Sequence, residues 1–161
     1  MKTSRRQFIR TGGAALASTA LFSAIPHGLQ AGGPFSASIG PFGCQMVYHN
    51  HHFEFEEIDG QLIYDVLLEE LDPDLVKMQF QVAVIDKGFK AEDYFRKYPG
   101  RFISAHLADY STELEEQVAV GQGIVNWEDL FKAAKEGGVK NYFVEMDPAT
   151  FEESAKYLLE H

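Results

Sequence analysis

Short apolar runs alternate with helical patterns along most of the chain. Alternating or continuous apolar residues predict strands over residues 45–49, 76–82, 102–107 and 142–145. Apolar residues spaced three and four apart predict a helix after each strand, over residues 64–70, 91–98, 127–136 and 150–159. Four strand–helix units in this order predict an α/β fold with a parallel sheet.

Each predicted strand has one apolar face and one face that ends in a polar residue. Alternate residues of a strand point to opposite faces of a sheet, so the apolar face suits a covering helix. At the carboxyl ends, the other face carries His49, Gln81, His106 and Glu145. Because parallel strands end at one edge of a sheet, we expect these four side chains to form one site.

The first 31 residues differ in composition from the rest of the chain. A basic start containing Arg5 and Arg6 precedes a weakly apolar run over residues 12–25. The stretch SRRQFI resembles a twin-arginine export signal, which predicts a helical or disordered signal segment over residues 1–31 and a periplasmic or secreted protein. The run is shorter than the ~20 residues of a membrane span, so we expect no stable span after processing, although an uncleaved signal would leave an anchor. Residues 32–44, rich in Gly, Ser and Pro, predict a flexible linker before a domain over residues 45–161.

Composition limits the partners that this domain can bind. The 161 residues are 45% hydrophobic and 24% charged, which is typical of one globular domain. The formal charge is −10, and loss of residues 1–31 would remove four cations and no acids, giving (14 − 4) − 24 = −14. Such a charge argues against a nucleic-acid partner and favours a small neutral one. A single cysteine, Cys44, excludes an internal disulfide and a Cys-based zinc cluster.

Five stretches resemble the sugar phosphate isomerase/epimerase family of xylose-isomerase-like barrels. In chain order they are YHNHHFEF, YDVLLEELDPDLVKMQF, YPGRFISAHLAD, VGQGIVNWEDLFKAAKEGGV and YFVEMD. The family fold is an eight-stranded TIM-type (β/α)8 barrel with its site at the carboxyl ends of the strands. The four units found here would be the last four, so the resemblance implies about half of a barrel.

The resemblance also implies a divalent metal and gives roles to the four strand-end residues. It makes His49, Gln81, His106 and Glu145 the metal ligands, with Glu145 also the proton shuttle. His49 and Gln81 stand where many relatives have Glu and Asp, which leaves one formal negative charge and favours Mn or Zn. As sugar contacts we expect His51, Gln79, Asp109 and Gln122.

Three hypotheses for function follow. The first is a sugar isomerase or epimerase, or a lyase or hydrolase of a keto-sugar, acting on a neutral sugar if a complete barrel is assembled. The second is a truncated, non-catalytic remnant or sugar-binding half-barrel, with self-association through its exposed sheet edges. The third, a metal-dependent nuclease, is disfavoured because the chain lacks a basic groove.

Two local expectations remain: Glu54 and Glu56 lie on an exposed strand edge, and residues 109–121 form either a lid or a solvated acidic loop.

Overall fold

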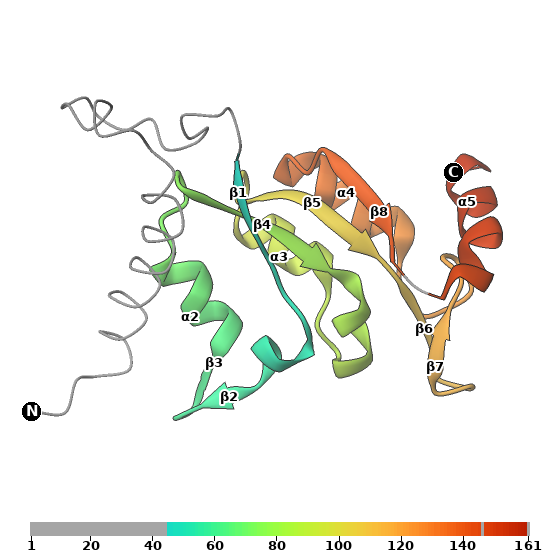
Figure 1. Ribbon diagram of the computed structural model, residues 1–161, viewed down its shortest axis with the longest axis horizontal. Helices are drawn as coiled ribbons and strands as arrows, with labels where there is room; N and C mark the ends of the chain where they lie inside the picture. Colours follow the sequence, from blue (N-terminus) through green and yellow to red (C-terminus); the bar gives the residue numbers. More distant parts are fainter. Residues whose placement is uncertain (1–44, 146, 161) are drawn as a thin grey trace, which may run out of the picture.

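A four-stranded parallel sheet organises the domain. The structure is a computed structural model that describes residues 45–145 and 147–160. Its sheet has the order β1-β4-β5-β8 and consists of β1 (Met46–His49), β4 (Val76–Gln81), β5 (Phe102–Leu107) and β8 (Asn141–Val144). All three neighbouring pairs run parallel (Figure 1). The predicted α/β fold and its four strands are thus confirmed, whereas the predicted signal and linker lie outside the described residues.

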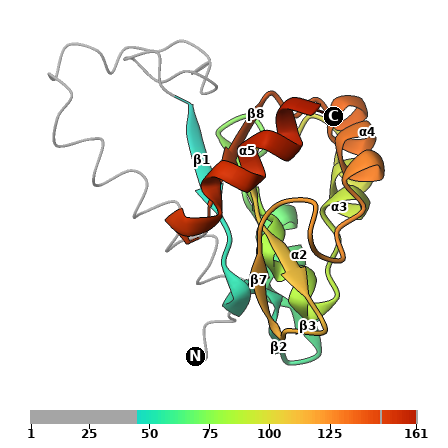
Figure 2. The same cartoon turned by 90° about the vertical axis from the view of Figure 1, so that its right-hand side faces the viewer.

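Four α-helices follow the four strands. They are α2 (Ile63–Glu70), α3 (Ala91–Lys97), α4 (Trp127–Gly137) and α5 (Phe151–Glu160). At the start of α4 the Asn126 side chain accepts a hydrogen bond from the Asp129 amide, and the helix ends at Gly138, whose φ of 84° suits glycine. Figure 2 shows α3 and α4 together on one face of the sheet. Among the described residues, none of the helices has the length and apolar content that crossing a membrane requires.

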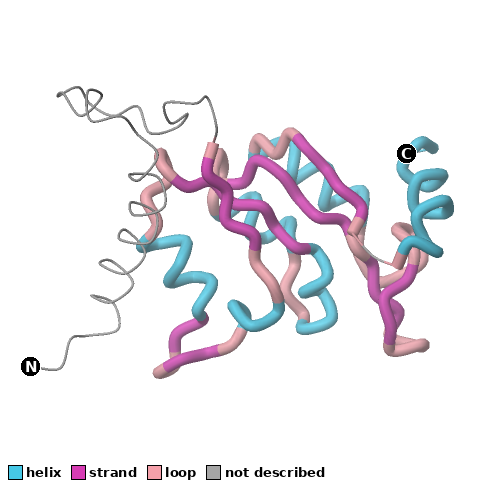
Figure 3. The backbone as a smooth tube through the Cα atoms, viewed as in Figure 1, coloured by secondary structure: helices cyan, strands magenta, loops and turns pink. Residues whose placement is uncertain are grey.

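Shorter elements connect these units, as the tube in Figure 3 shows. Two antiparallel hairpins pair β2 (Glu57–Ile58) with β3 (Gln61–Leu62), and β6 (Asp109–Ser111) with β7 (Glu116–Val118). The described residues also form three 3-10 turns: η3 (His52–Phe55), η4 (Val82–Lys87) and η5 (Pro148–Thr150). The segment after β5 is therefore a hairpin. The prediction that Glu54 lies on an exposed strand edge was wrong, because Glu54 is buried within the 3-10 turn η3.

A register shift between β4 and β5 determines which side chains enter the core. Met78 pairs with Phe102, but the next residue, Gln79, pairs with Ser104, so Ile103 is an extra residue in β5. An extra residue reverses the alternation of faces. Phe102 therefore packs with Phe80 in the core, while Ser104 and His106 occupy the opposite face, as predicted. Simple alternation had put Ile103 on the apolar face; Ile103 is half-buried and lies outside the core cluster.

Aromatic side chains fill the space between the sheet and its helices. Phe80 lies at the centre, with edge-on or tilted contacts to five other rings: Phe55, Tyr64, Tyr94, Phe95 and Phe102. Offset aromatic pairs add about 0.5–1.5 kcal/mol each beyond the area that they bury. This core fixes α2 and α3 against the sheet and so fixes the strands that carry the polar ends.

Asp109 holds the segment between β5 and α4 together. It is fully buried and its two carboxylate oxygens accept five hydrogen bonds. Four come from backbone amides and one from the Trp127 indole, and the donors are the amides of Tyr110, Gly121, Gly123 and Val125 and Nε1 of Trp127, at 2.8–3.1 Å. Since a buried charge is stable only with such partners, Asp109 is a structural anchor for this segment.

Replacing Asp109 by alanine is expected to destabilise the domain. The change leaves five donors without an acceptor, two of them buried and three partly buried, and each buried donor that loses its acceptor costs about 1–3 kcal/mol before relaxation. We expect Asp109→Ala to lower the free energy of unfolding by about 3 kcal/mol or more, measured by urea denaturation. Glu113→Ala, at an exposed position of the same hairpin, serves as the control and should change it by less than about 0.5 kcal/mol. Equal effects of the two variants would contradict the anchoring role.

Candidate metal centre

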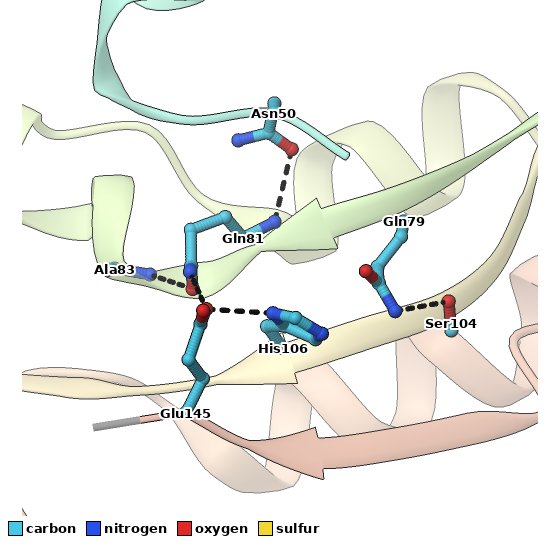
Figure 4. A network of polar contacts seen from close by, with 7 residues as sticks. All are labelled: Asn50, Gln79, Gln81, Ala83, Ser104, His106 and Glu145. Carbon is cyan, nitrogen blue, oxygen red and sulfur yellow. Dashed lines mark hydrogen bonds and ion pairs between the residues drawn. The ribbon is translucent and has the colours of Figure 1, made fainter. Parts of the chain in front are cut away.

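Three of the four predicted strand-end residues form a compact cluster. His49 ends β1, His106 lies near the end of β5, and Glu145 directly follows β8. One potential ligand atom from each residue lies within 4.8 Å of the other two. Figure 4 shows His106 and Glu145 turned toward one another at the sheet edge. Backbone pairing produces this proximity, because Gln81 pairs with His106 and the Glu145 amide donates to the Leu107 carbonyl.

Glu145 is held by two donors on one of its oxygens. His106 Nδ1 donates to Oε2 at 2.7 Å, and Gln81 Nε2 donates to the same oxygen. Burial alone would raise the pKa of Glu145, but the hydrogen bonds from His106 and Gln81, with the nearby imidazoles, hold the pKa below its ordinary value. Glu145 is therefore a carboxylate at neutral pH, and both described hydrogen bonds leave Oε1 to other partners.

The structure gives Gln81 a different role from the predicted one. Its amide oxygen accepts from the Ala83 amide at 3.3 Å, and its amide nitrogen faces Glu145 (Figure 4). Both neighbours require this orientation, since Ala83 can only donate and a carboxylate can only accept. An amide nitrogen is not a metal ligand, so we replace the predicted ligand role with that of a donor that positions Glu145.

His49 carries unused hydrogen-bonding capacity. Both of its ring nitrogens are shielded from solvent, and neither has a hydrogen-bond partner among the described residues. The ring lies 4.4 Å from that of His106 and 4.8 Å from that of His51, centre to centre. Burial lowers the pKa of His49, and His106 lowers it further by repulsion. The imidazole is thus neutral at neutral pH, which is the form that binds metals.

Two buried residues of the YHNHHFEF stretch support the cluster, and sequence reasoning missed both. Asn50 is fully buried and accepts from the Gln81 amide at 3.0 Å, which joins the ends of β1 and β4. Glu54 is only 1% exposed and accepts from the Tyr48 hydroxyl at 2.6 Å and the His51 amide at 2.8 Å. These contacts fix the backbone on both sides of His49. The sequence did contain a signal for their burial, because Asn50 and Glu54 stand among apolar and aromatic residues.

The four predicted sugar contacts are distributed unevenly around this cluster. His51 lies beside His49, and Gln79 donates to the Ser104 hydroxyl at 2.9 Å on the same face of the sheet. Both remain predictions. Gln122 donates to Glu153 of α5 at 2.8 Å, and the buried Asp109 has both oxygens occupied. Asp109 therefore cannot contact a sugar in this arrangement, and the glycine amides beside Gln122 bind Asp109.

One described cavity lies away from the cluster. It has a volume of about 440 Å³ and is lined by residues that include Leu68, Lys77 and Arg101. Lys77 lies near the amino end of β4 and Arg101 directly precedes β5, so the cavity is at the amino ends of the strands. Ligand sites of parallel α/β sheets lie at the carboxyl ends, and the strand-end cluster is therefore the better candidate.

Two solved structures share this arrangement of strands and helices. Both are sugar phosphate isomerase/epimerase structures from Parabacteroides distasonis ATCC 8503, with 29% and 28% sequence identity and TM-scores of 0.61 and 0.62. The chain is similar to sugar phosphate isomerases/epimerases. The similarity covers 71% and 72% of this chain and 45% of each of those chains, so the matched region corresponds to a partial barrel. No protein-family model matches the chain, and no curated protein sequence does.

The residues present fit a divalent metal. His49 has two shielded nitrogens without partners in the described part of the chain, and such groups are costly unless a ligand engages them. His106 uses Nδ1 for Glu145, which leaves Nε2 as a lone-pair donor. Two imidazoles and one carboxylate are a common donor set for zinc, and Mn also accepts them. The set fits a site with three protein ligands and an open position.

Replacing His49 by leucine tests two effects of His49 separately: the destabilisation of the metal-free domain by its shielded nitrogens, and its proposed role as a metal ligand. The side chains are similar in size, and the change removes two shielded polar atoms. In the presence of a chelator we expect His49→Leu to raise the free energy of unfolding by about 1 kcal/mol. Added Zn²⁺ should stabilise the original chain but not the variant, because a ligand that binds only the folded state raises its stability. Thermal and urea denaturation measure both effects.

His52→Leu is the matched control, since the half-buried His52 contacts Asp86 rather than the cluster. It should keep the stabilisation by Zn²⁺. A clear loss of stability in metal-free His49→Leu would show instead that His49 makes a stabilising contact within the domain.

Proposed function

We propose that the protein is a sugar isomerase/epimerase-like protein that acts on a neutral sugar or keto-sugar at a divalent metal site. The observation that carries this proposal is the convergence of His49, His106 and Glu145, with both His49 nitrogens shielded and without a partner among residues 45–145 and 147–160. The similarity to sugar phosphate isomerase/epimerase structures supports a sugar as the substrate, and the formal charge of −10 favours a neutral one. The proposal includes export to the periplasm or beyond, supported by the twin-arginine pattern of residues 4–9.

Each residue of the cluster has a distinct proposed role. His49 and His106 hold the metal, Mn or Zn, and Glu145 contributes a carboxylate oxygen. A bound divalent ion would polarise the sugar carbonyl and so acidify the neighbouring C–H bond. Glu145, ionised by its donors, accepts that proton and returns it to the neighbouring carbon, while the hydroxyl proton moves to the former carbonyl oxygen, to complete an isomerisation. An epimerisation needs a second group that delivers a proton to the opposite face of the same carbon. Gln81 keeps the carboxylate aligned by donating to Oε2.

A sugar-binding half-barrel without turnover is the second candidate. The observation in its favour is that the chain spans 45% of the length of the structures that it matches. Half of a barrel wall would supply fewer groups to a sugar than a closed barrel does. The two candidates share the metal site and differ in whether a proton is exchanged.

Metal binding is the first test of the proposal. Titration with Mn²⁺ and with Zn²⁺, followed by metal analysis after dialysis, should give about one equivalent per chain, as expected for a site with three protein ligands. The double variant His106→Ala/Glu145→Ala should lose this metal. The control His52→Ala/Glu57→Ala removes the same residue types outside the cluster, at a half-buried and an exposed position, and should retain the metal. Chain that binds neither ion would contradict the proposal.

Isotope exchange distinguishes the two candidates. A panel of neutral aldoses and ketoses, deuterated on the carbon beside the carbonyl, is incubated with the metal-loaded chain and followed by NMR. The enzyme hypothesis predicts loss of deuterium to water, abolished by Glu145→Gln because an amide does not accept the proton. Sugar binding without exchange in any member of the panel would favour the half-barrel that only binds.

A further inference from the structure

The two outer strands of the sheet lack the features that usually protect a sheet edge. No described strand pairs with the outer side of β1 or of β8. Soluble proteins commonly guard such edges with charged residues, proline or bulges, because unpaired backbone groups bind other strands. The two strands, Met46–His49 and Asn141–Val144, contain no Lys, Arg, Asp, Glu or Pro. Both edges are therefore suited to accept a further strand.

Apolar side chains are exposed on these same edges. Val47 of β1 is 37% exposed and Phe143 of β8 is 51% exposed, and Met46 and Tyr142 are similarly open. The chain carries a formal charge of −10, yet its acids lie outside the two edge strands. Association at the edges would thus bury apolar surface and pair backbone groups without bringing strand charges together.

The parallel order of the sheet determines how two such edges can meet. Since all four strands point the same way, a two-fold axis along the strand direction brings β8 of one copy beside β1 of the other, in parallel, at two equivalent junctions. We infer that two copies of this chain associate in this way into a closed, eight-stranded barrel. Closure leaves no free edge, whereas a single four-stranded sheet has two.

The size of the matched region supports a second copy as the partner. The chain corresponds to 45% of each similar structure, so two copies supply nearly a whole barrel wall. The strands remain parallel, and both His49–His106–Glu145 clusters then lie at the same end of the barrel and face its interior. The second copy would complete the wall around each cluster. This association goes beyond the proposed function and does not require the metal.

The mass of the 161-residue chain in solution is the direct test, measured in a chelator so that metal binding has no influence. Sedimentation over a range of concentrations should show monomer and dimer only. Backbone amides of the two edge strands should exchange with solvent more slowly in concentrated than in dilute samples, because pairing protects them. This second measurement needs no variant.

Val47→Lys introduces the missing edge charge two residues before His49, and the chelator keeps metal binding out of the comparison. We expect it to raise the dimer dissociation constant at least about tenfold. Leu114→Lys is the matched control: Leu114 is 64% exposed in the turn between β6 and β7, and its replacement should leave the constant unchanged. Circular dichroism checks that both variants are folded.

Several results would overturn the inference. They are a monomer at the highest soluble concentration, growth beyond the dimer into open assemblies, and equal weakening by Leu114→Lys. If Val47→Lys does not fold, the exchange measurement decides: edge amides that exchange equally fast in dilute and concentrated samples contradict the barrel. A chain that binds metal but stays monomeric would contradict this inference without contradicting the proposed function.

Discussion

Parallel pairing of β1, β4, β5 and β8 is the constraint on which the candidate site depends. Each strand turns its apolar face toward the helices, so its polar face must end at the common carboxyl edge. The pairing of Gln81 with His106 then sets which side chains meet. The extra residue in β5 matters here, because without it Phe102 and His106 would lie on the same face. The hydrophobic core and the polar cluster are therefore two consequences of one sheet.

The chemistry of the cluster comes from an imbalance between donors and acceptors. Glu145 accepts two hydrogen bonds on one oxygen, from His106 and from Gln81. The ring nitrogens of His49 have no hydrogen-bond partner among the described residues, although both are shielded from water. Buried polar groups normally have partners, and a ligand is the simplest reason for an exception. Asn50 and Glu54 stabilise the turn that holds the ring in this position.

Much of the fold was predictable because periodicity reports which face of an element is buried. The four strands, their helices and the convergence of His49, His106 and Glu145 all follow from it. The positions of Glu54 and Asp109 do not, since their partners are set by a 3-10 turn, by loop amides and by the Trp127 indole, which lies 18 residues from Asp109. The orientation of the Gln81 amide was also inaccessible, because it depends on Ala83 and Glu145 together.

X-ray absorption spectroscopy of the zinc-loaded chain tests the central claim most directly, because multiple scattering from imidazole rings identifies histidine ligands without relying on activity. The account predicts two imidazoles and at least one oxygen bound to the metal, with the imidazole contribution reduced in a chain that lacks His49. A spectrum with oxygen neighbours and no imidazole scattering would contradict it.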